Sequence, residues 1–506
     1  MLISPSLEAF TLAYGAAAPQ LVATRLVADL ETPVSAFLKL AAVMPGPRFL
    51  LESVEGGAVR GRYSIIGLSP DLIWRCAAGR AGINRDAGHD ADAFSPCPGT
   101  ALESLRALIA ESHIDAAEGL PPMAAGIFGF LGYDMVREME ALAPPNPDPI
   151  GLPDALLIRP SLVAVFDAVK DEVYLVTPVR PRAGVAAKAA YEAALERLER
   201  AIAAFDGPLP EGAHEAIDAA EVKPFISNTT EAQFHAMTAI AKEHILAGDI
   251  FQVVLSQRFE TEFTLPPLAL YRALRRVNPS PFLSFLDFGA FQIVCSSPEI
   301  LVRVRDGKVT IRPIAGTRPR GATAAEDQRL AAELLADPKE RAEHLMLLDL
   351  GRNDAGRVAE TGSVEVTGQF FLEYYSQVMH IVSNVEAKLA AGHDALDALI
   401  AGFPAGTVSG APKVRAMQII DALEHEKRGP YAGCIGYFGA DGAMDTCIVL
   451  RTAIVKDGRM HVQAGAGIVH DSIASAEQQE CFNKARALFK AAEEAVRFAS
   501  RAKRGQ

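Results

Sequence analysis

Two pairs of glutamates have the spacing that places both carboxylates on one face of a helix. Glu340 and Glu343 lie in a helix-like stretch, and Glu477 and Glu480 repeat the three-residue spacing near the C-terminus. If the two pairs converge, they form an oxygen-rich site suited to Mg²⁺, which usually links one or two carboxylates to an anionic substrate. The same spacing is common on solvated helices, so either pair alone is weak support for a site.

Three glycine-containing turns, at residues 314–318, 406–413 and 465–469, expose backbone N–H groups that could bind carboxylates or phosphates. The turn at 406–413 is one residue shorter than a P-loop and lacks its Lys-Ser/Thr ending. Beyond the third turn, His470 stands where a dinucleotide-binding fingerprint needs its last glycine. Nucleotide binding is therefore poorly supported, and a plain β-turn is the alternative for each segment.

Two polar residues interrupt apolar runs. His380 lies in Gln-Val-Met-His-Ile-Val, and Arg451 lies in Ile-Val-Leu-Arg-Thr-Ala-Ile. A charge within a buried strand must be paired or must bind a ligand. The alternatives are a core histidine with satisfied hydrogen bonds and an arginine exposed at a sheet edge.

The elements that must position these residues are short strands and separate helices. Asp-Gly turns at 305–308 and 456–459 predict hairpins between consecutive strands, and such hairpins with separate helices favour the α+β class over a repeating βαβ fold. The predicted helices are 185–205, 230–247, 324–349, 391–401 and 475–501. The predicted strands are 157–165, 173–179, 250–259, 291–295, 301–304, 309–314, 435–438, 446–454 and 460–464.

The composition is that of a folded, acidic protein. Half of the 506 residues are hydrophobic and 22% are charged, which excludes a largely disordered chain. The formal net charge is −13 without a basic block, so we expect neither nucleic acid nor membrane as a partner. We find no apolar segment of membrane-spanning length and no signal-peptide pattern. Six cysteines without a C-x-x-C pair further predict reduced thiols in the cytoplasm.

One segment has the composition of a linker. Residues 206–221 are rich in Pro, Gly and acidic residues and lack a strong apolar period. We therefore expect an N-terminal region at 1–205, a linker at 206–224 and a larger catalytic domain at 225–500.

Eleven segments, in their order along the chain, resemble the chorismate-utilising enzymes, and most closely the anthranilate synthase component I group. One such segment would be weak support, whereas eleven in series are very specific. The resemblance covers nearly the whole chain and is densest between residues 250 and 485. The segments are DIFQVVLSQRF, NPSPFLSFL, SSPEILVRV, RPIAGTRPRG, KERAEHLMLLDLGRND, QVMHIVS, FPAGTVSGAPK, RGPYAGCIGY, LRTAIV, QAGAGIVHDS and ExxExxxKA.

The resemblance implies two large, mainly antiparallel β-sheets packed together with helices on the outside. It implies Mg²⁺-dependent 2-amination of chorismate and loss of pyruvate to give anthranilate, the first committed step of tryptophan biosynthesis. It also implies ammonia from a glutamine amidotransferase partner subunit, since no amidotransferase segment is recognisable in the chain. We therefore expect a heteromer, in the form of a heterotetramer.

By the same resemblance, Glu343 and Glu480 match the family's main Mg²⁺ carboxylates, with Glu340 and Glu477 beside them. The metal is expected to bind the substrate's ring carboxylate and to draw charge from the ring. Glu340 is also the candidate general acid for the departing 4-hydroxyl. Crowding by like charges favours the protonated form that this role requires.

His380 matches a histidine associated with pyruvate loss, and Thr407 matches the wall near the amination centre. Gln252 lies where isochorismate and salicylate synthases carry a water-activating Lys, and a neutral Gln suits ammonia. Ala315 lies where aminodeoxychorismate synthases often carry a Lys nucleophile, which argues against 4-amination. The residues that match those around the substrate carboxylates are Gly316, Thr317, Tyr431, Arg451, Ala466, Gly467 and Lys484.

A site for L-tryptophan as an inhibitor is also implied. Glu52 and Ser53 end an L-L-E-S motif, while Pro281 and Phe282 end an N-P-S-P-F motif that Leu283 follows. In feedback-inhibited relatives these motifs line the pocket, with Glu52 and Ser53 at the amino acid's polar end and Pro281 near the indole. Phe282 and Leu283 stand where many relatives have Tyr and Met. The alternative is that both motifs are purely structural.

Three other functions remain open. Aminodeoxychorismate synthase component I is disfavoured by Ala315 and the L-L-E-S motif. A non-catalytic tryptophan-binding regulator on the same scaffold is disfavoured by the complete glutamate set together with His380 and Arg451. An unrelated Mg²⁺-dependent phosphate enzyme fits the carboxylates, but the chain lacks a recognisable phosphate loop.

Overall fold

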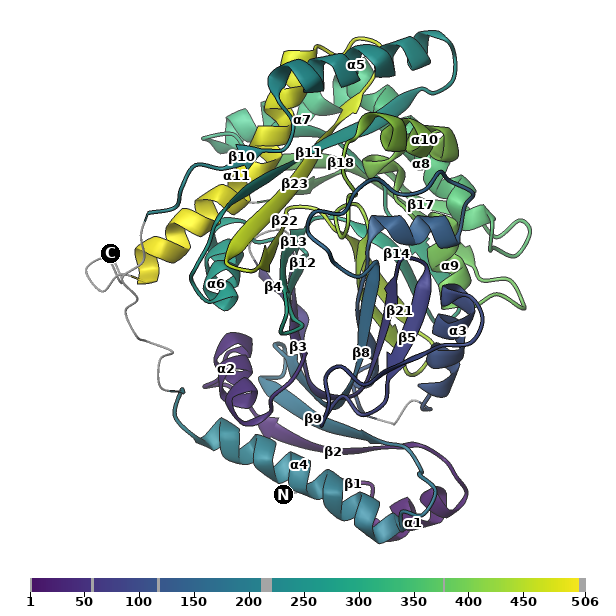
Figure 1. Cartoon of the computed structure of the whole chain (residues 1–506), viewed down its shortest axis with the longest axis vertical. Helices are drawn as coiled ribbons and strands as arrows, with labels where there is room; N and C mark the ends of the chain where they lie inside the picture. The colour runs from purple at the N-terminus through teal and green to yellow at the C-terminus, as the bar shows by residue number, and fades with distance from the viewer. Residues whose placement is uncertain (1, 56–58, 116–118, 211–220, 376–377, 500–506) are drawn as a thin grey trace.

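The chain folds into packed antiparallel β-sheets with helices on their outer faces (Figure 1). The computed structural model describes residues 2–55, 59–115, 119–210, 221–375 and 378–499. The strand pairs in these ranges are antiparallel. The predicted α+β class is therefore confirmed.

Two long strands, β4 (Val59–Ala77) and β8 (Ala155–Asp167), run through both sheets and join them into one hydrogen-bonded network. They pair with each other, and the register shifts between Pro70 and Leu72. Ser69, just before this shift, has a left-handed backbone φ of 49°. Strands commonly pass from one sheet to another at such bends.

The first sheet uses the N-terminal half of β4 and the C-terminal half of β8. Its order is β1–β2–β9–β8–β4–β3–β12–β13–β22–β23–β11–β10, and β19 also pairs with β11. The bounds are β1 Ile3–Ser4, β2 Gln20–Val27, β3 Arg48–Glu55, β9 Glu172–Val179, β10 Ile226–Ser227, β11 Gln252–Glu262, β12 Phe282–Asp287, β13 Gln292–Ser297, β19 Gly410–Ala411, β22 Thr452–Lys456 and β23 Arg459–Ile468.

The second sheet uses the other halves of β4 and β8. Its order is β6–β5–β4–β8–β7–β20–β21–β14–β15–β18, and β16 and β17 also pair with β18. The bounds are β5 Arg80–Asn84, β6 Phe94–Pro96, β7 Gly126–Leu131, β14 Ile300–Arg305, β15 Lys308–Ile311, β16 Ile314–Pro319, β17 Glu365–Tyr374, β18 Val378–Lys388, β20 Cys434–Gly439 and β21 Met444–Ile448.

Large hydrophobic clusters fill the space between these layers. The inner cluster lies between the sheets, where Phe49 stacks on Phe128 with ring centroids 4.5 Å apart. A second cluster lies beneath α1, α2, α4, α6 and α11, and a third beneath α3, α9 and α10. The helices are α1 Leu7–Gly15, α2 Pro33–Val43, α3 Ala101–Glu111, α4 Ala187–Asp206, α5 Glu231–Leu246, α6 Pro267–Val277, α7 Ala324–Ala336, α8 Pro338–Gly356, α9 Ala395–Gly402, α10 Lys413–Leu423 and α11 Ala474–Ala499.

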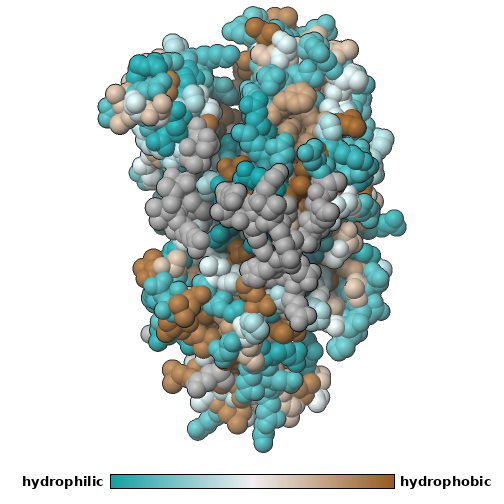
Figure 2. Space-filling model, turned by 90° about the vertical axis from the view of Figure 1, so that its left-hand side faces the viewer, coloured by the Kyte–Doolittle hydropathy of each residue, from teal (hydrophilic) through white to brown (hydrophobic). Residues whose placement is uncertain are grey.

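The surface of the molecule is largely hydrophilic on the face shown in Figure 2. Hydrophobic residues lie there in smaller groups. Within the described ranges, the helices fall short of the length and hydrophobicity that crossing a membrane requires.

Both predicted Asp-Gly hairpins are confirmed. Asp306 and Gly307 have φ angles of 50° and 68° between β14 and β15, and Asp457 and Gly458 have 50° and 72° between β22 and β23. Two consecutive positive φ angles match the right-handed twist of the flanking strands, and Asp-Gly supplies them at low cost.

Three predicted elements are each divided in two. The helix predicted at 324–349 breaks into α7 and α8 at Asp337, whose carboxylate accepts hydrogen bonds from the first turn of α8, and Pro338 then begins the new helix. The strand predicted at 309–314 splits into β15 and β16 around Pro313, which has no N–H for a sheet ladder. The strand predicted at 446–454 splits into β21 and β22, because Arg451 has a φ of 47°.

Both sides of the predicted linker contribute to both sheets. Strand β3 pairs with β12, and β7 pairs with β20, so residues 1–205 and 225–500 share their hydrogen-bonding ladders. Residues 211–220, within the predicted linker at 206–224, lie outside the described residues. The three boundaries stay a prediction.

Candidate functional site

The four glutamates of the predicted metal site come from the N-terminal turns of α8 and α11. Glu340 and Glu343 project from α8, and Glu477 and Glu480 project from α11. Burial, Glu340 and Glu480 raise the pKa of Glu343, so carboxylates of both helices lie close together. Burial and Glu480 likewise raise the pKa of Glu477. The structure therefore brings the two pairs into one region.

Two internal cations neutralise part of this cluster. Arg318 donates a hydrogen bond of 2.8 Å to Glu340, and Lys484 lies 2.7 Å from Glu480. In the described ranges, no three acidic, histidine or cysteine side chains stand close enough to hold a metal ion in this arrangement. The oxygen donors are nonetheless those that Mg²⁺ prefers, and a divalent cation would relieve the like-charge crowding around Glu343. The residues present therefore fit a magnesium ion.

His380 is a buried, neutral imidazole on β18. Its Nδ1 lies 3.1 Å from the Gly316 carbonyl oxygen and 3.1 Å from the Thr317 hydroxyl. A carbonyl only accepts, so Nδ1 carries the proton and Nε2 keeps a free lone pair. Burial and the neighbouring charge of Arg451 lower the pKa of His380 to about 4. Near neutral pH this side chain is therefore suited to act as a base.

Glu299, in the turn between β13 and β14, is a functional candidate to which the sequence patterns assigned no role. Its Oε2 accepts a hydrogen bond of 3.1 Å from Thr407, which lies in the short 3₁₀ helix η2 (Gly406–Val408). A cavity of about 40 Å³ adjoins both residues. Burial raises the pKa of Glu299 to about 7, against the opposing effects of Thr407, Arg451 and Lys484. A carboxyl that is partly protonated at neutral pH can serve as a general acid.

A signal for Glu299 was present in the sequence. It stands between two apolar runs, at residues 293–295 and 300–302, and is the one charged residue between them. The argument applied to His380 and Arg451, that a buried charge needs a partner or a function, applies to Glu299 equally.

Arg451, Lys484 and Tyr431 supply further hydrogen-bond donors, and the charges of Arg451 and Lys484 act on Glu299. Burial lowers the pKa of Arg451, and its left-handed backbone is a strained conformation for a side-chain-bearing residue. Lys484 donates a hydrogen bond of 2.9 Å to the Gly465 carbonyl. Burial raises the pKa of Tyr431 to about 12, so its hydroxyl stays protonated. Two cations and a phenol of this kind can bind carboxylates.

Gln252 lies beside Gly467 and has an unused acceptor. A Cβ at Gly467 would lie 2.4 Å from the Gln252 Nε2 atom, so any larger residue there would displace the Gln252 amide. Within the described residues the buried Oε1 atom of Gln252 has no hydrogen-bond partner. An unsatisfied buried acceptor costs about 1–3 kcal/mol, which a ligand N–H would recover. Neighbouring Ala466 is packed in the hydrophobic core, so its backbone is what it offers a ligand.

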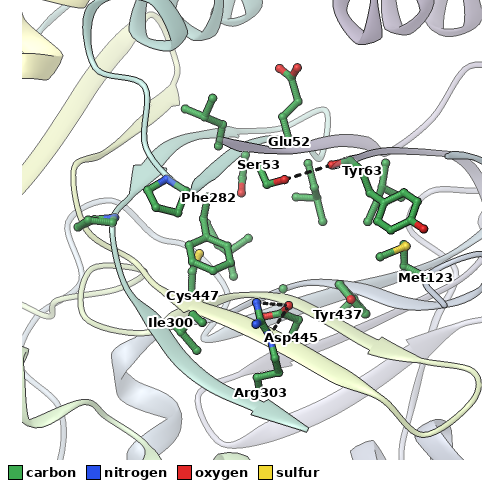
Figure 3. Close-up of a pocket in the computed structure, with 18 of the residues that line it drawn as sticks. Glu52, Ser53, Tyr63, Met123, Phe282, Ile300, Arg303, Tyr437, Asp445 and Cys447 are labelled. Atoms are coloured by element: carbon green, nitrogen blue, oxygen red, sulfur yellow. Dashed lines mark hydrogen bonds and ion pairs between the residues drawn. The ribbon is translucent and has the colours of Figure 1, made fainter. Parts of the chain in front are cut away.

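A second, larger cavity of about 450 Å³ lies between the sheets (Figure 3). Its apolar wall includes Met123 and Ile300, and its polar wall includes Arg303 and Asp445, which are 2.9 Å apart. The five residues predicted for the inhibitor site all border this cavity: Glu52, Ser53, Pro281, Phe282 and Leu283.

The carboxylate of Glu52 has other partners. It accepts hydrogen bonds of 2.7 and 2.8 Å from Arg275 and of 2.5 Å from Tyr271, both on α6. Figure 3 shows Glu52 directed away from the other labelled side chains. Asp445 also borders the cavity, and its buried Oδ1 atom lacks a hydrogen-bond partner among the described residues. The sequence patterns did not single out Asp445.

Comparison with known proteins assigns a family. A family model described as chorismate binding enzyme matches residues 47–490. The chain is 57% identical over 500 residues to anthranilate synthase component 1 of Cereibacter sphaeroides, with 99% of this chain and 100% of that protein covered. It is 49% identical to anthranilate synthase component 1 of Thermus thermophilus, with 92% and 96% covered. The crystal structure of anthranilate synthase component I from Streptococcus pneumoniae has a TM-score of 0.75 at 40% identity, with 85% and 92% covered. Because these similarities span most of the chain, it belongs to the chorismate binding enzyme family.

Proposed function

We propose that the chain is anthranilate synthase component I, which aminates chorismate at C2 and then eliminates pyruvate to give anthranilate. The observation that carries this proposal is the convergence of the four glutamates, neutral His380 and the buried acid Glu299 in one region. The names of the relatives, component 1, support a partner component. We infer that this partner is a glutamine amidotransferase that supplies ammonia in a heteromeric complex.

Substrate binding follows from the cations that act on Glu299. Chorismate carries two carboxylates, and Arg451, Lys484 and Tyr431 offer donors for their oxygens. Glu343 and Glu480 would hold Mg²⁺, with Glu340 and Glu477 beside them, and the bound ion would supply Lewis-acid stabilisation of charge on the ring carboxylate.

Two carboxyl groups compete for the role of general acid toward the departing 4-hydroxyl. Glu340 is engaged by Arg318 at 2.8 Å. Glu299 has a raised pKa of about 7 and a hydrogen bond from Thr407. Glu299 therefore supplies the proton more readily near neutral pH.

The nucleophile and the base follow from Gln252 and His380. Ammonia carries N–H donors, so the unpaired Oε1 atom of Gln252 can accept one of them and orient the nitrogen lone pair toward C2. The second step requires removal of the C2 proton while the C–O bond to the enolpyruvyl group breaks. The free Nε2 lone pair of His380 can accept that proton, because burial keeps the imidazole neutral.

Anthranilate fluorescence tests the proposed function. Purified protein with chorismate, Mg²⁺ and an ammonium salt at mildly alkaline pH is expected to produce anthranilate, and omission of Mg²⁺ is expected to stop it. Mass spectrometry and chromatography of the products separate 2-amino from 4-amino compounds. A 4-aminated product, or no aminated product with ammonia supplied directly, would contradict the proposal.

Glu299→Gln is expected to lower kcat about 10²- to 10³-fold, because an amide cannot donate the proton that general acid catalysis supplies. For the unmodified protein, kcat/KM for chorismate is expected to fall as pH rises through about 7, since Glu299 loses its proton there. This decline should be absent in the variant. Rates must be expressed per concentration of free ammonia, whose own protonation changes with pH. A variant with unaltered kcat would return the acid role to Glu340.

We further propose that the 450 Å³ cavity binds L-tryptophan as a feedback inhibitor. Its apolar wall suits an indole, and its arginines suit a carboxylate. Tyr375 and Ile314 also border it, and the Tyr375 ring lies 5.5 Å from the imidazole of His380. Inhibition then requires that tryptophan bind preferentially to a less active arrangement of these neighbours.

Ser53→Phe is expected to raise the inhibition constant for tryptophan at least tenfold, because a phenyl group would occupy space at the cavity wall. A tenfold change in the inhibition constant corresponds to a loss of about 1.4 kcal/mol of binding free energy. The uninhibited rate should stay within about twofold, since Ser53 lies outside the catalytic region. Inhibition titrations of anthranilate formation measure this effect. Ser53→Ala is the matched control and should remain inhibited. Unchanged inhibition of the Phe variant would reject the proposed pocket.

A further inference from the structure

One cation lies directly on a carboxylate of the proposed metal site. The Arg318 guanidinium donates a hydrogen bond of 2.8 Å to Glu340 Oε1. Their side chains are only 20% and 23% exposed, so solvent screens this pair incompletely. A carboxylate oxygen that accepts from a guanidinium has less electron density to offer a metal ion. Arg318 therefore occupies a position that a divalent cation would contest.

Arg318 also has partners to which it can turn. Its second terminal nitrogen lies 2.8 Å from Asp337, and its Nε lies 3.5 Å from Glu333. It further donates a hydrogen bond of 3.0 Å to the carbonyl of Thr317. Release of Glu340 would therefore leave the guanidinium paired, without the penalty of an isolated buried charge.

The position of Arg318 connects this ion pair to the catalytic region. It lies on β16 next to Thr317, which is opposite His380 in the β16–β18 ladder. Asp337, its alternative partner, caps the first turn of α8, from which Glu340 projects. Arg318 thus links strand β16 to the first turn of helix α8, from which the first of the proposed metal-binding glutamates projects.

We propose that Arg318 is an internal counter-ion that competes with the divalent cation for Glu340 and thereby sets the metal affinity of the site. In the metal-free protein Arg318 holds Glu340 in place and offsets repulsion among the glutamates. With a divalent cation bound, the Glu340 carboxylate would serve the cation, and Arg318 would keep its ion pairs with Asp337 and Glu333. This inference rests on the metal site that is part of the proposed function.

Removal of Arg318 is expected to tighten metal binding. Without the competing guanidinium, Glu340 is free for the cation and the local negative charge increases by one unit. We expect Arg318→Gln to lower the dissociation constant about tenfold, the change that a coupling of this kind produces at a partly buried site. Arg318→Lys keeps the positive charge but lacks the forked donors of the guanidinium. Its dissociation constant for the cation should therefore lie between those of the unmodified protein and of Arg318→Gln.

The test is a titration of the full-length, chelator-treated protein with Mn²⁺ alone, read by the electron paramagnetic resonance signal of free Mn²⁺. Lys339→Gln is the matched control, because Lys339 affects Glu343 and Glu477 through space without a hydrogen bond to Glu340. Its dissociation constant should change less than about twofold, since charges at longer range are screened. Circular dichroism checks folding, and Arg318→Lys serves if the Gln variant does not fold.

Each outcome of the titrations either supports or contradicts the proposal. Loss of Mn²⁺ binding in Glu480→Gln, with tighter binding in Arg318→Gln and little change in Lys339→Gln, supports the proposal. If Glu480→Gln loses Mn²⁺ binding but Arg318→Gln binds Mn²⁺ equally or more weakly than the unmodified protein, the counter-ion role is overturned. The proposed metal site is then still supported. Equal tightening in Lys339→Gln also overturns it, because general electrostatics then suffices. Unaltered Mn²⁺ binding in Glu480→Gln overturns the metal site and the counter-ion role together.

Discussion

Replacing Glu480 by Gln is expected to lower Mg²⁺-dependent kcat at least about 10³-fold while the fold stays intact. An amide of the same shape keeps the packing of α11 but removes the negative charge on which metal binding depends. Lewis-acid stabilisation by a bound metal contributes several kcal/mol, and each 1.36 kcal/mol is about tenfold in rate. Glu480 is half-exposed, so its replacement leaves no buried polar group unpaired.

The measurement is anthranilate fluorescence at saturating chorismate and ammonium over a series of Mg²⁺ concentrations. Glu493→Gln is the matched control, because Glu493 is an exposed glutamate farther along α11. It should keep the full rate, and circular dichroism should show the same fold for both variants. Normal turnover in Glu480→Gln would contradict the assignment of Glu480 to the proposed Mg²⁺ site.

His380→Met is expected to retain amination but to slow anthranilate release about 10²- to 10⁴-fold, the range that a positioned base contributes. Methionine has a similar volume and suits a buried position, but its thioether cannot take the C2 proton. The imidazole is held by Gly316 and Thr317 with its Nε2 free, and this geometry serves proton removal. The first step does not require that base, because ammonia attacks without prior deprotonation.

Liquid chromatography with mass spectrometry separates the two steps. Chorismate should disappear and an aminated, non-aromatic compound should accumulate, while anthranilate fluorescence stays low. Tyr375→Phe is the control, because it preserves the ring that packs against His380 and removes only the hydroxyl that donates to Glu373. Unchanged anthranilate release in His380→Met would count against the role of the histidine, whereas equal loss of both steps would indicate a general distortion of the site.

The two cavities offer a physical link between the proposed catalytic residues and the proposed inhibitor site. The larger one is lined by strands of both sheets, and Arg312 and Ile300 border both cavities. A ligand in the larger cavity would therefore contact side chains that also line the smaller cavity beside Glu299. Because close-packed interiors transmit small displacements, occupation of one cavity can change the shape of the other.

Local patterns in the sequence predicted most of the elements. The Asp-Gly turns predicted both hairpins, since those residues accept two positive φ angles in succession. The helix predicted at 185–205 is α4, within two residues at each end, because helical periodicity depends on neighbours along the chain. The breaks at Asp337 and Pro313 were missed, although capping and proline signals marked both positions.

The sequence by itself determined the class of fold, the family and the kinds of residues available for chemistry. Only the tertiary structure decided which of them meet. Glu343 and Glu480 are more than a hundred residues apart, so their mutual repulsion depends on how α8 and α11 pack rather than on spacing. Burial gives Glu299 its raised pKa, and pairing with α6 turns Glu52 out of the cavity that its motif borders. Burial, charge proximity and side-chain direction arise from long-range packing, which a pattern of neighbouring residues does not contain.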